Sequence, residues 1–208
     1  MLNRFQLPAV LILSAIIWTG VLWFGKQSLS WELAQPYGIT AGTMAALLVA
    51  FDRWVWHWPI LRGWLVTTPN IDGTWDVSLR SSYVDNNGTA IGPISAKLVA
   101  TQTHSSLIVR LVSEKSASHT IGYDIRDTGG GVFEIMGVYI NEPRYEFREP
   151  GGIHYGTFKL QLIEGAAPEL IGHYWTDRKT SGTFVATNKR ARKVGDMQRA
   201  GSAATSGT

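Results

Sequence analysis

The sequence predicts a membrane-anchored all-β protein: an N-terminal two-helix transmembrane hairpin, a compact eight-stranded antiparallel β-barrel and a disordered basic tail. Three observations along the 208 residues support this prediction. Two uncharged windows occupy residues 5–25 and 33–51, alternating apolar residues begin after Pro69, and basic residues gather after residue 188. Seven of the nine tryptophans lie within residues 1–65, so the overall composition conceals a strong difference between the two parts of the chain.

The first window has the length of a membrane-spanning helix. At 1.5 Å per residue, residues 5–25 extend about 31 Å, one thickness of the hydrocarbon core. Arg4 also suits the start of a cleaved signal peptide, whose apolar part is about 7–15 residues long. The run is longer than that and no A-x-A-like cleavage site follows it, so we predict a span.

The second window, residues 33–51, is less apolar but carries small residues at regular spacing. Gly38, Gly42, Ala46 and Ala50 are each four residues apart and therefore form a small-residue face on a helix. Small residues allow helices to approach closely in lipid. This face fits a packing seam between the two helices of one chain, a seam between protomers, or both.

The distribution of charge predicts the orientation of the hairpin. Arg4, Arg53 and Arg62 flank the windows, whereas Lys26 in the short connection is balanced by Glu32. Positive flanks favour the cytoplasmic side, so we expect a multi-pass inner-membrane protein with both termini and the barrel in the cytoplasm. The tryptophans that resemble an aromatic belt after the second window are Trp54, Trp56, Trp58 and Trp64.

After Pro69 the hydrophobic period changes to two, which predicts half-buried strands. Glycine-rich breakers, such as residues 128–131, separate the segments. The predicted strands cover residues 73–83, 94–103, 105–114, 118–127, 132–141, 153–163, 169–178 and 182–188.

So many short strands within residues 69–188 favour a closed up-and-down barrel, a lipocalin-like architecture that holds side chains or one small ligand. A β-sandwich is the competing architecture. The connections are too short for crossover helices, so a parallel sheet is not expected. We therefore place a cytoplasmic ligand-binding domain at residues 69–188, after a helical part at residues 1–65.

Residues 189–208 form the predicted tail. The segment from Lys189 to Arg199 has five basic residues and one acidic residue, so its net charge is +4. Because the net charge of the whole chain is +3, the remaining residues together carry −1. The folded body is therefore not expected to bind DNA or RNA. The tail fits a solubilising end or a contact with anionic membrane lipids.

The sequence lacks the signatures of catalytic and metal sites. Because there is no cysteine, disulfides, thiol catalysis and cysteine-bound metals are excluded. Phosphate-binding glycine loops, nucleophile elbows and paired carboxylates are also missing. We predict that the protein is not an enzyme and has no catalytic residue, metal or cofactor. The histidines, interpreted as surface or strand residues, are His57, His104, His119, His154 and His173.

Two predicted strands carry aromatic and polar side chains on one face. In an extended chain Tyr139 and Asn141 point to the same side, as do Tyr174, Thr176 and Arg178. Aromatic rings, an amide and a guanidinium on a shared face suit a nucleobase and a phosphate. The same pattern also fits core tyrosines and a solvated arginine, so the residues alone leave both interpretations open.

The order of the motifs resembles the two-transmembrane β-barrel effectors of the bacterial cyclic-oligonucleotide-based antiphage signalling systems (CBASS), the SMODS-associating 2TM β-strand-rich effector family. The motifs that carry the resemblance are Trp-Val-Trp-His-Trp-Pro-Ile at 54–60, Pro69-Asn70-Ile71-Asp72-Gly73-Thr74-Trp75, Gln102-Thr103, Ser116-Ala117-Ser118, Tyr139-Ile140-Asn141-Glu142-Pro143, His154-Tyr155-Gly156 and Gly172-His173-Tyr174-Trp175-Thr176-Asp177-Arg178 with Gly182.

The resemblance implies a function. In that family a cognate CD-NTase cyclase makes a cyclic dinucleotide during phage infection, and the barrel of the effector binds it. Binding drives homo-oligomerisation, the helices disrupt the inner membrane, and the infected cell dies (abortive infection). The expected ligand-binding residues are Tyr139, Asn141, Tyr174, Thr176 and Arg178, with Trp75 at the barrel floor.

The placement of the arginines and the alternative functions give further expectations. Arg178 is the cation best placed for a phosphate, whereas Arg80 and Arg110 lie opposite the apolar residues of their strands and are expected outside. The alternative function is a membrane-anchored lipocalin-like barrel that binds a lipid or fatty acid and has no need of Arg178. A purely structural membrane protein with a side-chain-filled barrel is the third reading.

Overall fold

The structure divides into two units, each considered by itself. Met1–Val66 and Thr103–Ser106 form the first unit, and Thr67–Gln102 and Leu107–Thr208 form the second. The computed structural model describes residues 12, 14–16, 18–20, 23, 31–84, 88–89, 91–147, 152–165 and 167–191.

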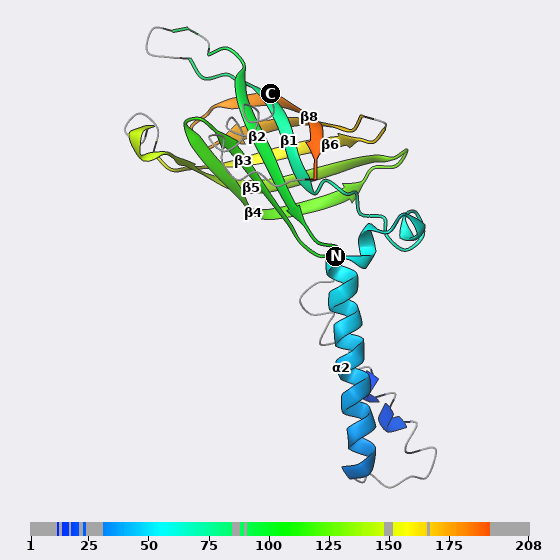
Figure 1. Ribbon diagram of the computed structural model, residues 1–208. Helices are drawn as coiled ribbons and strands as arrows, with labels where there is room; N and C mark the ends of the chain where they lie inside the picture. The colour runs from blue at the N-terminus through cyan, green and yellow to red at the C-terminus, as the bar shows by residue number, and fades with distance from the viewer. Residues whose placement is uncertain are drawn as a thin grey trace, which may run out of the picture. The chain divides into compact units, whose positions relative to one another are not determined.

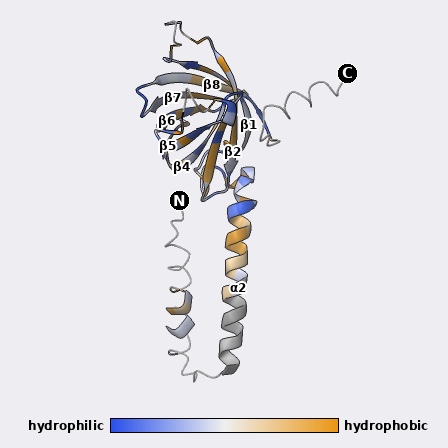
Figure 2. Ribbon diagram, turned by 90° about the vertical axis from the view of Figure 1, so that its left-hand side faces the viewer, coloured by the Kyte–Doolittle hydropathy of each residue, from blue (hydrophilic) through white to orange (hydrophobic). Residues whose placement is uncertain are grey.

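The first unit contains helix α2 (Trp31–Arg53) and the short 3-10 helices η1 (Val55–His57) and η2 (Pro59–Leu61) (Figure 1). The described part of α2 is mainly hydrophobic and becomes hydrophilic at its C-terminal end (Figure 2). The large apolar side chains exposed on α2 are Met44, Leu47 and Val49.

Helix α2 covers the second predicted window with two additional residues at each end. The first window, residues 5–25, lies mostly outside the described residues, although residues 12, 14–16, 18–20 and 23 are helical. In the part of the chain that is described, no helix combines the length and the apolarity needed to cross a membrane.

The small-residue face is open where its side chains are described. Gly42 and Ala46 are exposed, and Ala50 is half-buried. No described atom lies within 4 Å of the position that a Cβ on Gly42 would take. This glycine therefore has room for a neighbour to approach.

The first unit also includes the turn Thr103–Ser106, which the end of α2 holds by hydrogen bonds. The backbone N–H of His104 donates to the Asp52 carbonyl (3.0 Å), and that of Ser105 donates to the Asp52 carboxylate (2.8 Å). The rings of His104 and Phe51 meet edge to face, with centroids 5.1 Å apart. Asp52 thus supplies two acceptors for this turn.

The second unit is the predicted barrel (Figure 1). Among the described residues eight antiparallel strands, each paired with the next, close into a ring through β8 and β1, so the sandwich alternative is wrong. Because the ring is closed, no strand has a free edge. The strands are β1 (Gly73–Ser81), β2 (Ile94–Gln102), β3 (Leu107–Ser113), β4 (Ser116–Asp127), β5 (Val132–Pro143), β6 (His154–Ile163), β7 (Glu169–Thr176) and β8 (Ser181–Arg190).

β8 extends two residues into the segment predicted as tail, and both of these residues are held by β1 and the segment before it. Lys189 Nζ donates to the Asn70 carbonyl (2.7 Å) and lies 5.6 Å from the centre of the Trp75 ring. Arg190 forms an ion pair with Asp76 on β1. Residues 192–208 lie outside the described set.

The alternating residues of the strands form the barrel core. Ile135, Leu160 and Leu170 are completely buried, and each such side chain contributes about 1.5–3 kcal/mol by leaving water. Hydrophobic and hydrophilic residues alternate visibly along the strands (Figure 2). Core packing therefore fixes the register and decides which side chains point inward.

The segment before β1 closes one end of the barrel, which we call the floor. Gln102 accepts a hydrogen bond from the Ile71 N–H (2.9 Å) and donates one to the Pro69 carbonyl (2.8 Å). The Gln102 N–H donates to the Asp72 carboxylate (2.8 Å), and the Trp75 indole donates to the Ile71 carbonyl (3.0 Å). These bonds satisfy polar groups in a buried place.

Candidate ligand-binding site

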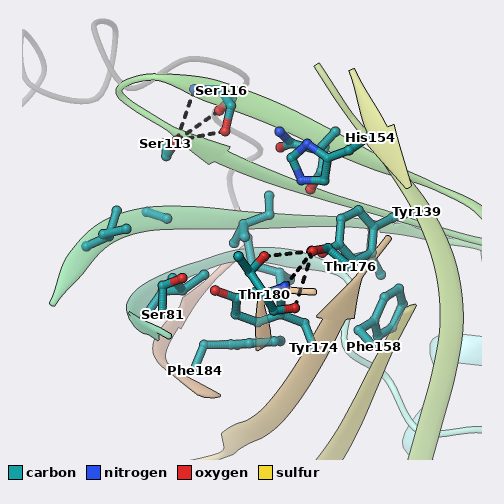
Figure 3. A pocket seen from close by; sticks show the side chains of 18 of the residues that line it. Ser81, Ser113, Ser116, Tyr139, His154, Phe158, Tyr174, Thr176, Thr180 and Phe184 are labelled. Carbon is teal, nitrogen blue, oxygen red and sulfur yellow. Dashed lines mark hydrogen bonds between the residues drawn. The ribbon is translucent and has the colours of Figure 1, made fainter. Parts of the chain in front are cut away.

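The barrel holds a cavity of about 560 Å³. Its deep part is apolar, and its other part is rich in hydroxyl groups (Figure 3). The apolar lining consists of Leu79, Ile94, Ala96, Leu98, Val109, Leu111, Phe158, Leu160 and Phe184. The polar lining consists of Ser81, Tyr83, Ser113, Ser116, Ser118, Thr120, Tyr139, Asn141, His154, Tyr174, Thr176, Arg178 and Thr180.

The polar residues lie at the end of the barrel opposite the floor, which we call the mouth. In an up-and-down barrel the β1–β2, β3–β4, β5–β6 and β7–β8 turns share one end, and the polar lining lies beside these turns. Along β1 the inward residue changes from Leu79 to Ser81, and along β3 from Leu111 to Ser113. The cavity therefore suits a ligand with an apolar or aromatic part and a polar or charged part.

The five predicted binding residues all line this one cavity. Tyr139 and Asn141 extend from β5, Tyr174 and Thr176 from β7, and Arg178 from the turn that follows β7. Residues of two strands that are separated by β6 therefore meet at one cavity. Trp75, in contrast, is fully buried and is not among the residues that line the cavity.

Two glycines make room for the two tyrosines. Gly156 on β6 pairs with Tyr139, and a Cβ at Gly156 would overlap the Tyr139 ring. Gly182 on β8 pairs with Tyr174, and a Cβ there would stand 2.7 Å from a carbon of the Tyr174 ring. The ring of each tyrosine therefore extends over a neighbouring strand at a position that carries no side chain.

The two tyrosines are hydrogen-bond donors at neutral pH. Burial raises the pKa of Tyr139 far above its usual range, and Tyr174 and Asp177 add to the rise. Burial also raises the pKa of Tyr174, although a hydrogen bond with Ser81 acts in the opposite direction. Both phenols therefore stay protonated, and each offers an O–H group together with an aromatic face.

Pairs of hydroxyl groups lie on two sides of the mouth (Figure 3). Thr176 Oγ1 and Thr180 Oγ1 are 2.7 Å apart. At the β3–β4 turn, Ser113 Oγ lies 3.2 Å from Ser116 Oγ and accepts a hydrogen bond from the Ser116 N–H (3.1 Å). Such groups both donate and accept, so they can turn a donor toward an anionic ligand.

Arg178 is positioned by the turn that carries it. The Asp177 N–H donates to the Tyr155 carbonyl (3.0 Å), and the Tyr155 N–H donates to the Asp177 carboxylate (3.1 Å), so the turn is fastened to β6. The Arg178 guanidinium donates to the Gly152 carbonyl through Nη2. Arg80 and Arg110 are exposed and do not line the cavity, as predicted.

The charge around the cavity favours an anion. Among the described residues that line it there is no aspartate or glutamate, and Arg178 is the sole arginine or lysine. No group of three histidine, aspartate or glutamate side chains in the described residues is placed to hold a metal ion. An arginine in a site without carboxylates is a typical partner for a phosphate.

Sequence reasoning missed several mouth residues. His154 is a strand residue, as expected, but its side chain lines the cavity because it shares the phase of Phe158 and Leu160 on β6. Extending the alternation of each strand by one more step identifies Ser81 and Ser113 in the same way. The missed polar residues are Ser81, Tyr83, Ser113, Ser116, Ser118, Thr120, His154 and Thr180.

Comparison with protein families decides what kind of barrel this is. The family model described as "Cap15, cyclic dinucleotide receptor domain" matches residues 66–188. The chain belongs to the Cap15 cyclic dinucleotide receptor family. The resemblance to CBASS effectors is thereby confirmed, while a search of curated proteins gave no significant match.

The region that matches the Cap15 domain contains both the floor and the mouth. It begins before Pro69, whose carbonyl meets Gln102, and it includes every residue of the cavity lining named above. It ends two residues before β8 does. The motifs at residues 69–75 and 102 thus have a structural role, because they close the Cap15 barrel beneath its cavity.

Proposed function

We propose that this chain is an antiphage effector whose barrel binds a cyclic dinucleotide made by a cognate cyclase. Binding drives self-assembly, the N-terminal helices disrupt the inner membrane, and the infected cell dies. The observation that carries the proposal is a cavity with an apolar deep part and a hydroxyl-rich mouth containing Arg178, in a domain of the Cap15 family. The chain acts as a receptor, not as an enzyme.

The cavity suits both parts of such a ligand. A nucleobase would lie in the apolar part, against the rings of Tyr139, Phe158 and Tyr174, and base–aromatic stacking contributes about 1–3 kcal/mol. The phosphates would lie at the mouth, where Arg178 and the Thr176–Thr180 pair offer donors. A buried phosphate needs such partners, because an unpaired buried charge is strongly unfavourable.

The membrane part of the proposal is supported by the N-terminal residues. The first window is uncharged over residues 5–25, and α2 exposes Met44, Leu47 and Val49. We place both termini and the barrel in the cytoplasm, with the tail beside anionic lipids. Self-assembly would use the small-residue face, where Gly42 has no described neighbour within 4 Å of a Cβ position.

Dye release from vesicles tests the proposal. The full chain is reconstituted into vesicles made from bacterial lipids, and cyclic di-AMP, cyclic di-GMP, cyclic GMP–AMP and cyclic di-UMP are added separately. We expect at least one to release the dye, while palmitate and a linear dinucleotide do not. Release by palmitate alone would favour the lipid-binding alternative, and release by nothing would contradict the effector function.

A further inference from the structure

The charge of the mouth does not match that of the proposed ligand. A cyclic dinucleotide has two phosphodiester groups and therefore two negative charges at neutral pH. Among the described residues of the lining, Arg178 alone carries a permanent positive charge. If the proposed function is right, as this inference assumes, the described lining offers a permanent cation to one phosphate, and the other phosphate calls for a residue that gains a proton.

His154 is placed to supply that partner. It begins β6, points into the cavity with the phase of Phe158, and lies among the side chains of the mouth (Figure 3). Its Nδ1 lies 3.4 Å from the Gly152 carbonyl oxygen, and the guanidinium of Arg178 donates to the same oxygen. The Gly152 carbonyl thus holds the side chains of His154 and Arg178 at the same side of the mouth.

The surroundings of His154 determine its charge before a ligand arrives. Its neighbours on β5 are Asn141, directly opposite in the register, and Tyr139, whose phenol stays neutral. The charged groups that act on it come from the β7–β8 turn, Asp177 and Arg178. Burial lowers the pKa of His154 and Arg178 lowers it further, against the opposing effects of the Gly152 carbonyl and Asp177, so the imidazole is neutral at pH 7.

We propose that His154 is the second phosphate-binding group and that it takes up a proton when the cyclic dinucleotide binds. A phosphate beside the ring favours the imidazolium form. Protonation would also give the ring a donor on each nitrogen, so it could hold the Gly152 carbonyl and a phosphate oxygen together. Arg178 and the imidazolium of His154 would then present two positive charges to the two phosphates.

This proposal determines how affinity depends on pH. The pKa of His154 is higher in the complex than in the free chain, so affinity is greatest below the free-state pKa. As the pH rises from the free-state pKa to that of the complex, affinity falls by up to about tenfold per pH unit. Outside this interval a single titrating histidine leaves the affinity unchanged.

Calorimetry on the full chain in detergent micelles tests the proposal. The titrant is the tightest-binding member of the four cyclic dinucleotides named above, and two buffers with different ionisation enthalpies report the protons taken up. At pH 7.4 we expect wild type to take up about half a proton to one proton. From pH 6 to pH 8 we expect the dissociation constant to rise about fivefold or more.

Three variants test whether His154 is the cause of the proton uptake and of the pH dependence. His154→Gln should take up no proton and should bind with a dissociation constant that does not change with pH. His154→Lys should also lose the pH dependence but keep an affinity close to that of wild type at low pH. The control His119→Gln changes an exposed histidine of β4 outside the lining and should behave as wild type.

The unfavourable results distinguish a failure of the role of His154 from a failure of the proposed function. Tight binding by wild type without proton uptake and without pH dependence would overturn the role of His154 and leave the proposed function intact. Proton uptake that persists in folded His154→Gln, checked by circular dichroism, would do the same. Failure of wild type to bind any of the four nucleotides would overturn both the role of His154 and the proposed function.

Discussion

Among single residues, Arg178 is the one that we expect to determine how well the cavity holds an anion. It is the sole arginine or lysine in the described lining, and its turn is fastened to β6 by two hydrogen bonds between Asp177 and Tyr155. The guanidinium already donates to the Gly152 carbonyl. It is therefore held at the mouth before a ligand binds, which reduces the entropy lost on binding.

Replacement of Arg178 tests this role. Because a hydrogen bond to a charged group contributes about 1.5–3 kcal/mol, we expect Arg178→Ala to weaken cyclic dinucleotide binding by about 10–150-fold. Arg80→Ala, which removes an exposed arginine outside the cavity, is the matched control and should bind as wild type. Equilibrium titration gives both constants, and an unchanged constant for folded Arg178→Ala would remove it from the site.

The candidate binding residues could be predicted wherever strand alternation decides the direction of a side chain. Tyr139 and Asn141 continue the inward phase of Ile135, and the structure places all three inside. His154 has the same phase as Phe158, but the signal is weak, because no apolar residue marks the first four positions of β6 as inward-facing. The proximity of Arg178 to Gly152 could not be predicted, since it depends on how two turns meet.

At the scale of elements, Gln102 at the end of β2 fastens the floor. Its amide bonds the Ile71 N–H and the Pro69 carbonyl, and all three residues are buried. Strand positions could be predicted from their period, but these partners lie 31 and 33 residues away and only the closed barrel brings them together. The sequence therefore predicted a closed barrel of strands but not the hydrogen bonds that fasten its floor.

Loss of this amide should destabilise the barrel. Gln102→Leu leaves a buried N–H and a buried C=O without a partner, at about 1–3 kcal/mol each. We expect the thermal midpoint to fall by roughly 10 °C, measured by circular dichroism on the full chain in detergent. Thr101→Ala, at the exposed neighbouring position, should change the midpoint by less than about 2 °C. An equal midpoint for wild type and Gln102→Leu would show that the floor does not depend on this residue.

In the whole molecule, the proposed function requires that a ligand in the barrel change the behaviour of the N-terminal helices. A ligand shifts an assembly equilibrium only if it binds the assembled state more tightly. The helices need a surface on which to meet, and we assign this role to Gly38, Gly42, Ala46 and Ala50. The arrangement of protomers leaves no periodic pattern in the sequence. The sequence therefore predicts the small-residue face but not the helix that packs against it.

A bulky side chain on this face should separate binding from killing. We expect Gly42→Leu to bind the cyclic dinucleotide as wild type, because the cavity is unchanged, and to lose toxicity in cells that express the cyclase. Thr43→Leu, on an adjacent exposed position of α2, is the matched control and should stay toxic. Undiminished killing by Gly42→Leu would exclude the small-residue face from the mechanism.

A thermal-shift measurement on the full chain in detergent tests whether the barrel is a receptor for a cyclic dinucleotide. At 100 times its dissociation constant a ligand stabilises the folded state by about 2.7 kcal/mol, which raises the midpoint by several degrees. We predict such a shift with at least one of the four cyclic dinucleotides, a smaller shift for Arg178→Ala, and none with palmitate. A shift with palmitate and with none of the nucleotides would show that the barrel binds a lipid and is not a cyclic dinucleotide receptor.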